Sequence, residues 1–222
     1  MDYQKPCHYS IRLIDRLKSL DTKNALDFDL INKAIYWAKK YHGEQKRKSG
    51  EPYYSHPLEA AYMISDYKLK TDVIVASILH DIIEDTEVTA GMILDNFGWR
   101  ITEMVDMLTR DRPDGNKLSV EEIVNKAYQK QDEEVLLIKL FDRLHNLTTL
   151  DAMTDEKKKK IALETLSSFL AIALSFDEKG DQMIAKLCFS HLQLNYSQPS
   201  FSFSNICKLK PIEFDFIKLS KP

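Results

Sequence analysis

The sequence predicts an all-α protein. Apolar residues recur at helical spacing in one segment after another, and only 6 glycines and 7 prolines interrupt the 222 residues. With 44% hydrophobic residues, among them 10 Phe and 10 Tyr, the chain can bury a substantial core. Its length suits one large domain, or one domain with an appendage.

Amphipathic spacing and capping residues set the limits of the expected helices. Ile31, Ala34 and Ile35 form one apolar stripe, and Ser119 followed by Glu122 is a capping box that predicts a helix start. We expect about nine to ten helices in all. They are predicted over residues 11–17, 30–41, 58–67, 71–85, 89–97, 99–108, 119–129, 133–150, 155–175 and 181–194.

Two loops interrupt the helical pattern. The first runs from His42 to Ser55, is basic in its middle and contains two glycines that allow sharp turns. Pro57 follows it and suits the first turn of a helix, so we expect His56 in the N-terminal cap region of that helix. The second, Asp111 to Asn116, is rich in turn-forming residues and predicts a mobile connector.

The C-terminal segment has a different pattern. Ser197 to Pro222 contains alternating patches such as Phe201-Ser202-Phe203, which suit an irregular or strand-like tail. We therefore predict a helical domain over residues 1–196 and a tail over residues 197–222.

The charge balance gives no reason to expect nucleic acid as a partner. The formal charge is −3, with 31 basic and 34 acidic residues, so an anionic ligand has to be held by a local cluster. The basic run Lys157 to Lys160 follows Asp155 and Glu156, and we interpret it as a solvated helix face.

The cysteines and the absence of long apolar runs suggest a cytoplasmic protein. Cys7, Cys188 and Cys207 are odd in number and far apart, as expected for free thiols in a reducing compartment. The first residues lack the apolar core of a signal peptide, and no apolar run approaches the ~20 residues that span a bilayer. A cytoplasmic location without a membrane partner follows by default.

The stretch from Ile78 to Thr86 carries the strongest functional signal. It places His80 and Asp81, then Glu84 and Asp85, beside an apolar run, each pair separated from the other by one helical turn. Three carboxylates and an imidazole next to a buried face are unfavourable unless a cation or a substrate compensates them. This favours a functional site over the alternative, a solvated helix end.

A second polar strip lies in the apolar helix predicted over residues 133–150. Asp142 and Asn146 are one turn apart and gain nothing from hydrocarbon neighbours. Asp142 would complete a set of two imidazoles and two carboxylates that suits a borderline divalent metal, without a thiolate that favours structural zinc. The set is His56, His80, Asp81 and Asp142.

The other histidines are interpreted as structural. His42 is expected to orient the loop, and His145 to face away from Asp142 or to make a structural hydrogen bond. His8 and His191 lack acidic neighbours at a suitable spacing.

The order His56, His80-Asp81, Asp142 resembles the H…HD…D pattern of HD-domain phosphohydrolases. The segments RKSGEPYYSHP, ILHDIIEDT and IKLFDRLHNLTTL are similar to the hydrolase domain of RelA/SpoT-type enzymes, over roughly residues 27 to 170. Those enzymes remove the 3′-pyrophosphate from the alarmones ppGpp and pppGpp, giving GDP or GTP and pyrophosphate. The resemblance implies an all-helical HD-domain bundle and a cytoplasmic enzyme of the stringent response, a guanosine-3′,5′-bis(diphosphate) 3′-pyrophosphohydrolase.

The resemblance also implies roles for individual residues. The four metal-set residues would bind Mn²⁺, and Glu84 and Asp85 match the acidic pair thought to handle the attacking water. Residues that match contacts to the nucleotide are Arg47, Lys48, Ser49 and Asn146, with Thr149 as a weaker candidate. The metal would neutralise charge on the diphosphate and activate a water, while the acidic pair transfers protons.

Some features depart from the family or leave alternatives open. The synthetase domain of the long enzymes would follow the hydrolase domain, and the chain ends too soon to hold one, so we expect a stand-alone small alarmone hydrolase. The sequence differs from that of the family at Arg110 to Leu118 and at Thr148. Guanine recognition is therefore left unassigned. The alternatives are an HD-type hydrolase of another nucleotide such as NADPH, and a non-catalytic nucleotide sensor; a homo-oligomer is possible in each case.

Overall fold

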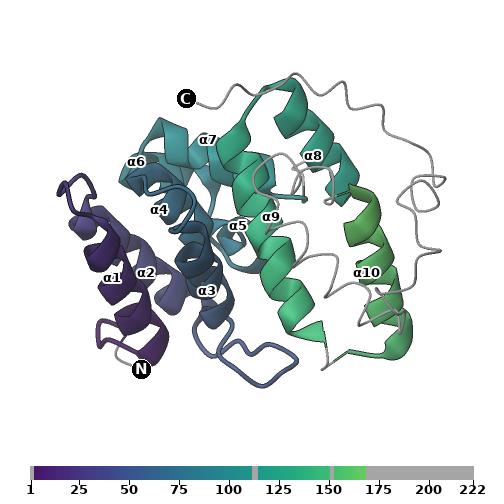
Figure 1. The fold of residues 1–222 in the computed structure, drawn as a ribbon, viewed down its shortest axis with the longest axis horizontal. Helices are drawn as coiled ribbons and strands as arrows, with labels where there is room; N and C mark the ends of the chain where they lie inside the picture. The colour runs from purple at the N-terminus through teal and green to yellow at the C-terminus, as the bar shows by residue number, and fades with distance from the viewer. Residues whose placement is uncertain (1–2, 112–114, 151–152, 169–222) are drawn as a thin grey trace, which may run out of the picture. The chain divides into compact units, whose positions relative to one another are not determined.

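The computed structural model describes residues 3–111, 115–150 and 153–168 (Figure 1). In these residues it contains ten helices and no strand, which confirms the all-α prediction. The helices are α1 (His8–Leu20), α2 (Phe28–His42), α3 (Ser55–Ile64), α4 (Thr71–Leu79), α5 (Ile82–Asp85), α6 (Ala90–Phe97), α7 (Trp99–Leu108), α8 (Val120–Gln129), α9 (Glu133–Thr148) and α10 (Asp155–Ser168). The helix predicted over 181–194 and the predicted tail lie outside the described residues, and their limits stay predictions.

The chain divides into two units, residues 1–145 and 146–222, and the group of described residues that could hold a metal lies in the first. Within that unit α4 packs against α2, α3 and α7 (Figure 1). Every residue from Val73 to Leu79 is buried. A helix that is apolar all round belongs in the middle of a core, and this is where α4 lies.

The central helix predicted over Thr71–Asp85 is wrong as a single element. The α-helix ends at Leu79, His80 and Asp81 form a turn, and α5 begins at Ile82. The backbone amides of Glu84 and Asp85 both bond to the carbonyl of Asp81, which starts the new helix there. His80 and Glu84 therefore do not form an i,i+4 pair within one continuous helix.

The helix that carries His56 begins earlier than predicted. It runs from Ser55 to Ile64 instead of from Leu58 to Tyr67, so His56 and Pro57 both lie in its first turn. Proline is tolerated there because the first amides of a helix have no intrahelical acceptor. This register buries His56, which is 1% exposed.

The start of α9 is fixed by Arg100 of α7. Its guanidinium donates to both carboxylate oxygens of Asp132, at 2.7 and 2.9 Å, and to Glu134 at 2.9 Å. Asp132 also accepts a hydrogen bond from the amide of Val135 at the first turn of α9. Bidentate pairs of this kind set geometry as well as energy, so α9 is held in register where it enters the core.

The ends of the other helices follow local sequence. The capping box of Ser119 and Glu122 is present and starts α8, as predicted. Asp27 accepts a hydrogen bond from the amide of Leu30 and caps α2. No helix in the described part of the chain combines the length and the apolar character needed to cross a membrane.

Candidate metal centre and catalytic site

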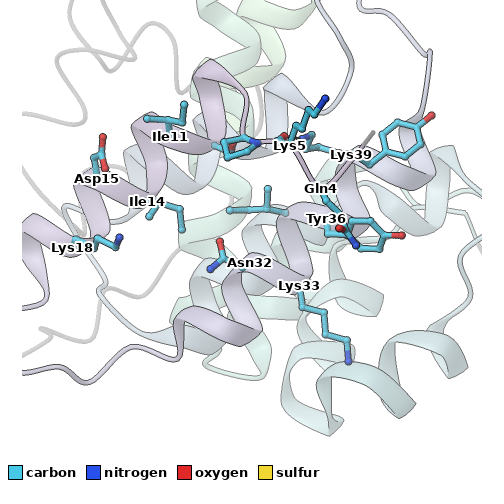
Figure 2. A pocket seen from close by; sticks show the side chains of 14 residues that line it. Gln4, Lys5, Ile11, Ile14, Asp15, Lys18, Asn32, Lys33, Tyr36 and Lys39 are labelled. Atoms are coloured by element: carbon cyan, nitrogen blue, oxygen red, sulfur yellow. Dashed lines mark hydrogen bonds between the residues drawn. The ribbon is translucent and has the colours of Figure 1, made fainter. Parts of the chain in front are cut away.

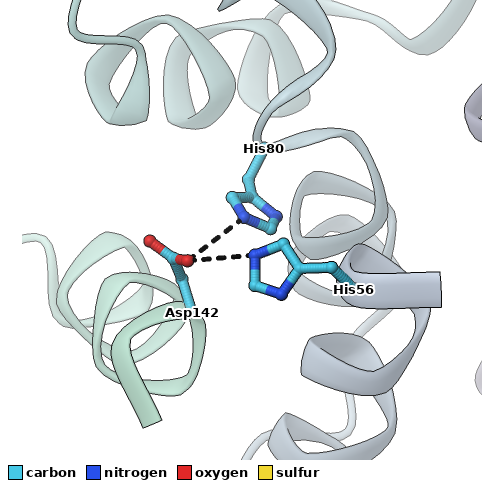
Figure 3. A group of neighbouring side chains, drawn as sticks. All are labelled: His56, His80 and Asp142. Carbon is cyan, nitrogen blue, oxygen red and sulfur yellow. Dashed lines mark hydrogen bonds and ion pairs between the residues drawn. The ribbon is translucent and has the colours of Figure 1, made fainter. Parts of the chain in front are cut away.

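His56, His80 and Asp142 come together from three separate elements (Figure 3). His56 lies in α3, His80 in the turn after α4, and Asp142 in α9. One donor atom from each lies within 4.8 Å of the others, and all three side chains are buried. His56 Nε2 is 3.1 Å and His80 Nε2 3.7 Å from Asp142 Oδ1.

Asp81, the fourth predicted ligand, borders this cluster. Its Oδ1 lies 3.2 Å from His80 Nε2, and its Oδ2 lies 3.5 Å from His56 Nε2. The Asp81 side chain is 19% exposed, so it is the member of the predicted set that faces solvent most. The carboxylate therefore contacts both imidazoles at the edge of the cluster.

The imidazole of His80 is oriented as a metal ligand requires. Its Nδ1 lies 2.7 Å from the carbonyl of Ser77, which can only accept, so Nδ1 carries the proton. The buried Nε2 then faces the carboxylates, 3.2 Å from Asp81 Oδ1 and 3.7 Å from Asp142 Oδ1, and it offers a lone pair to a cation when the ring is neutral. A histidine that donates one ring nitrogen to a carbonyl and directs the other, buried nitrogen at carboxylates fits a divalent cation.

The charges of the cluster depend on one another. Burial opposes ionisation of Asp81, but the neighbouring His80 lowers the pKa of that carboxyl below its usual value. Burial also opposes a charge on His80, yet Asp81 and Asp142 raise its pKa to about 10. A metal-free cluster thus holds a proton where a divalent cation would bind.

Lys139 is a buried partner of the cluster that sequence reasoning missed. It is 7% exposed, lies one turn before Asp142 on α9, and donates from Nζ to Asp142 Oδ2 at 2.8 Å. Burial of Asp142 is unfavourable, but Lys139 together with His56 and His80 holds the pKa of Asp142 well below its usual value. The i,i+3 spacing of a lysine and an aspartate in an apolar helix was the available signal.

His145 makes a hydrogen bond, as one of the two predicted alternatives stated. Its Nδ1 lies 2.8 Å from Nδ1 of His56. Burial lowers the pKa of His145 to about 3, with further contributions from His56 and Arg47, so its ring is neutral.

Glu84 and Asp85, the predicted proton-transfer pair, lie on the short helix α5. Partial burial raises the pKa of Glu84, while a hydrogen bond from the Arg110 amide acts in the opposite direction. Partial desolvation raises the pKa of Asp85, against the effect of a hydrogen bond from Tyr53. The charge of Asp81 raises both pKa values, so both carboxyls lie within electrostatic range of the cluster.

The basic loop forms a tight turn with Arg47, Lys48 and Ser49 near its tip. Lys46 and Pro52 form an isolated antiparallel bridge, and the Arg47 amide donates to the carbonyl of Glu51 at 2.9 Å. Arg47 is close enough to lower the pKa of His145, whereas Lys48 and Ser49 are exposed.

At its base the loop is attached to α5. His42 Nδ1 lies 3.0 Å from Gln45 Oε1, and Gln45 Nε2 donates to the Asp85 carbonyl at 2.8 Å. The His42 ring also stacks on Tyr53 at 4.8 Å between centroids. The expected role of His42 in orienting the loop is consistent with these contacts.

Asn146 and Thr149, the remaining predicted contacts to the nucleotide, belong to the second unit. The Thr149 hydroxyl donates to the Asn146 carbonyl at 3.2 Å. Their contact with a nucleotide stays a prediction.

A pocket of 590 Å³ lies elsewhere in the first unit, lined by α1, α2 and the segment before α1 (Figure 2). None of its lining residues is a predicted site residue. Lys39 in its wall is 5% exposed and donates to the carbonyl of Lys5, so this buried ammonium has a neutral partner.

Comparison with known proteins assigns the chain to a family. A family model described as HD domain matches residues 34–174, more than half of the chain. The chain belongs to the HD domain family. His56, His80-Asp81 and Asp142 all lie within the matched HD domain.

Curated relatives match this chain at about two-fifths identity. The chain is 39% identical over 155 residues to a probable guanosine-3′,5′-bis(diphosphate) 3′-pyrophosphohydrolase of Mycoplasma pneumoniae, covering 65% of this chain and 21% of the relative. It is 38% identical over 149 residues to the Aquifex aeolicus enzyme named guanosine-3′,5′-bis(diphosphate) 3′-pyrophosphohydrolase, covering 64% and 21%. A GTP pyrophosphokinase of Myxococcus xanthus is 41% identical over 191 residues, covering 82% and 25%. The chain thus spans about a fifth to a quarter of the length of these relatives.

A solved structure has the same fold. It is that of a metazoan SpoT orthologue described as hydrolysing ppGpp, with a TM-score of 0.58 and 20% identity. The alignment covers 86% of this chain and 99% of the other, so the likeness in fold extends over nearly the whole of that chain.

The pKa of His80 predicts how metal binding depends on pH. Because that pKa is about 10 in the metal-free protein, a cation that takes Nε2 has to displace a proton near neutral pH. Calorimetry in buffers of different ionisation enthalpy should show release of roughly one proton per metal ion, and the apparent affinity should rise about tenfold per pH unit below that pKa. Binding that releases no proton would contradict a role for His80 Nε2.

The Lys139–Asp142 pair predicts a large effect on stability. Lys139→Met removes the ammonium that donates to the buried Asp142 carboxylate, so in the presence of a chelator the free energy of unfolding should fall by about 3 kcal/mol. Lys39→Met, a matched control, removes an equally buried ammonium that donates to the neutral Lys5 carbonyl, and should cost about 1 kcal/mol or less. Urea unfolding of both variants measures the difference, and equal losses would exclude a special role for the pair.

Proposed function

We propose that the protein is a metal-dependent hydrolase that removes the 3′-pyrophosphate from ppGpp and pppGpp. The products are GDP or GTP and pyrophosphate. The observation that carries the proposal is the buried cluster of His56, His80 and Asp142, with one donor atom of each within 4.8 Å of the others. A buried group of ionisable donors without a structural need for them is where a functional site is expected.

The names of the relatives indicate guanosine nucleotides as the class of substrate, but they include two different reactions. The choice between these reactions rests on the residues of the site. Two of them are named as pyrophosphohydrolases, a third as a GTP pyrophosphokinase, and this chain spans about a quarter or less of each. The HD residues of this chain all lie within the matched HD domain, residues 34–174. Two imidazoles and two carboxylates suit a hydrolytic metal centre, and this favours the hydrolase over the kinase activity.

The proposed metal is Mn²⁺, held by His56, His80, Asp81 and Asp142. A donor set of nitrogen and oxygen atoms without a thiolate suits a borderline or hard divalent cation. When bound, the ion would act as a Lewis acid toward the diphosphate group. Lys139 compensates one of the two carboxylates, so the cation meets a site of moderate negative charge.

The basic loop is proposed to bind the phosphates. Arg47 offers a planar pair of donors for bidentate contact, and Lys48 adds a mobile positive charge at the turn tip. Ser49 supplies a hydroxyl donor beside them, and Asn146 and Thr149 are proposed to contact the nucleoside. The loop is fastened to α5 through Gln45, which keeps these cations close to Glu84 and Asp85.

Glu84 and Asp85 are proposed to move protons. A general base works best when its pKa approaches the operating pH, and the pKa of each carboxyl is raised from its ordinary value toward that pH. One of them would accept the proton of the attacking water and return a proton to the leaving oxygen. A cytoplasmic location belongs to the same proposal, since the nucleotide substrates are cytoplasmic.

Turnover tests the proposal directly. Purified protein incubated with ppGpp and Mn²⁺ should release pyrophosphate and GDP, and chelation should abolish the release. A panel with pppGpp and NADPH distinguishes the alternative nucleotide hydrolase. Binding of ppGpp without any hydrolysis would favour the sensor instead, and hydrolysis unaffected by chelation would exclude the metal centre.

Two substitutions separate the metal ligand from the proton carrier. Glu84→Gln keeps an oxygen to accept from the Arg110 amide and removes only the titratable group, so it should retain Mn²⁺ and ppGpp affinity but lose about 10² to 10⁴ in turnover. Asp81→Asn should lose metal affinity, because it removes a charged ligand. Elemental analysis, nucleotide calorimetry and pyrophosphate release check each variant. A metal-free Glu84→Gln protein would make Glu84 a ligand.

A further inference from the structure

His145 lies one helical turn after Asp142 on α9 and contacts a ligand that comes from another helix. Its Nδ1 is 2.8 Å from Nδ1 of His56, and the two ring centroids are 4.8 Å apart. Both side chains are buried, His56 being 1% and His145 9% exposed. The contact is therefore a hydrogen bond that water does not replace.

The proton in this hydrogen bond can lie on either ring. The two arrangements differ in whether Nε2 of His56 carries a proton or offers a lone pair to a metal. If His145 donates, a neutral His56 carries its proton on Nε2 and directs an N–H at Asp142 Oδ1, 3.1 Å away. If His56 donates, its Nε2 presents a lone pair to the same space. Only the second arrangement lets His56 act as a ligand.

We propose that His145 is a positioning residue, whose Nδ1 accepts the Nδ1–H of His56 and so holds His56 as an Nε2 metal ligand. The inference rests on the metal centre of the proposed function. His80 has the equivalent arrangement, since its Nδ1 donates to the Ser77 carbonyl. The two imidazoles thus have different acceptors, a main-chain carbonyl in one case and a neutral imidazole in the other.

The position of His145 on α9 explains why a side chain performs this role. His56 lies in the first turn of α3, so it has no carbonyl of a preceding turn of helix to accept its Nδ1–H as His80 does. The acceptor comes from α9, which also supplies Asp142. One helix face therefore provides one ligand and orients a second.

Metal binding by two variants tests the inference. His145→Phe keeps a planar ring of similar shape but has no acceptor, so the Mn²⁺ affinity should fall by about 10- to 100-fold. His145→Asn places an amide oxygen near the position of Nδ1 and should recover most of that loss. His8→Phe, which removes an exposed imidazole on α1, should bind Mn²⁺ as the wild type does.

A spectroscopic readout separates orientation from a general loss of packing. In protein loaded with diamagnetic Mg²⁺, the Nδ1–H of His56 should give an exchange-protected imidazole signal, which His145→Phe removes and His145→Asn restores. Circular dichroism should show the same helix content for all variants. Wild-type affinity in His145→Phe, or an unchanged His56 signal, would overturn the role of His145 while leaving the metal centre intact. Failure of the wild type to bind any divalent ion would overturn the proposed function itself.

Discussion

Compensation of the buried Asp142 carboxylate is the constraint on which the site depends. An aspartate 6% exposed in an apolar helix is stable only if cations or donors surround it. Lys139 occupies Oδ2, so Oδ1 is the oxygen that faces His56 and His80. The two carboxylate oxygens of Asp142 thus have different partners. Oδ2 accepts from Lys139, and Oδ1 is left to face the two imidazoles.

The end of α4 orients the His80 ring. The apolar sequence from Val73 to Leu79 buries the helix completely, and the chain leaves helical geometry at the two polar residues that follow. The Ser77 carbonyl, one of the last of the helix, then accepts from the His80 ring instead of from a backbone amide. The end of α4 therefore orients the His80 ring, and Glu84 and Asp85 lie on the separate helix α5.

Local sequence predicted much of the fold, and the reasons for the failures are physical. Helical spacing and few breakers located the helices, and the capping box at Ser119 gave the start of α8. Periodicity could not detect the break after Leu79, because His80 and Asp81 continue the helical spacing while the His80 ring bonds to the Ser77 carbonyl of the helix end. His56, His80 and Asp142 could be grouped as ligand types, whereas Lys139 was overlooked. The bond between His145 and His56 joins residues 89 positions apart, so no local pattern encodes its geometry.

Diffraction from Mn²⁺-soaked crystals is the decisive test of whether His56, His80, Asp81 and Asp142 form the proposed metal site. An anomalous difference map recorded at the manganese absorption edge locates the ion independently of any assay of turnover. We expect a single strong peak in contact with Nε2 of both histidines and Oδ1 of Asp142, with the Asp81 carboxylate completing the set. A strong peak elsewhere, or none at this cluster in crystals that remain ordered, would contradict the assignment.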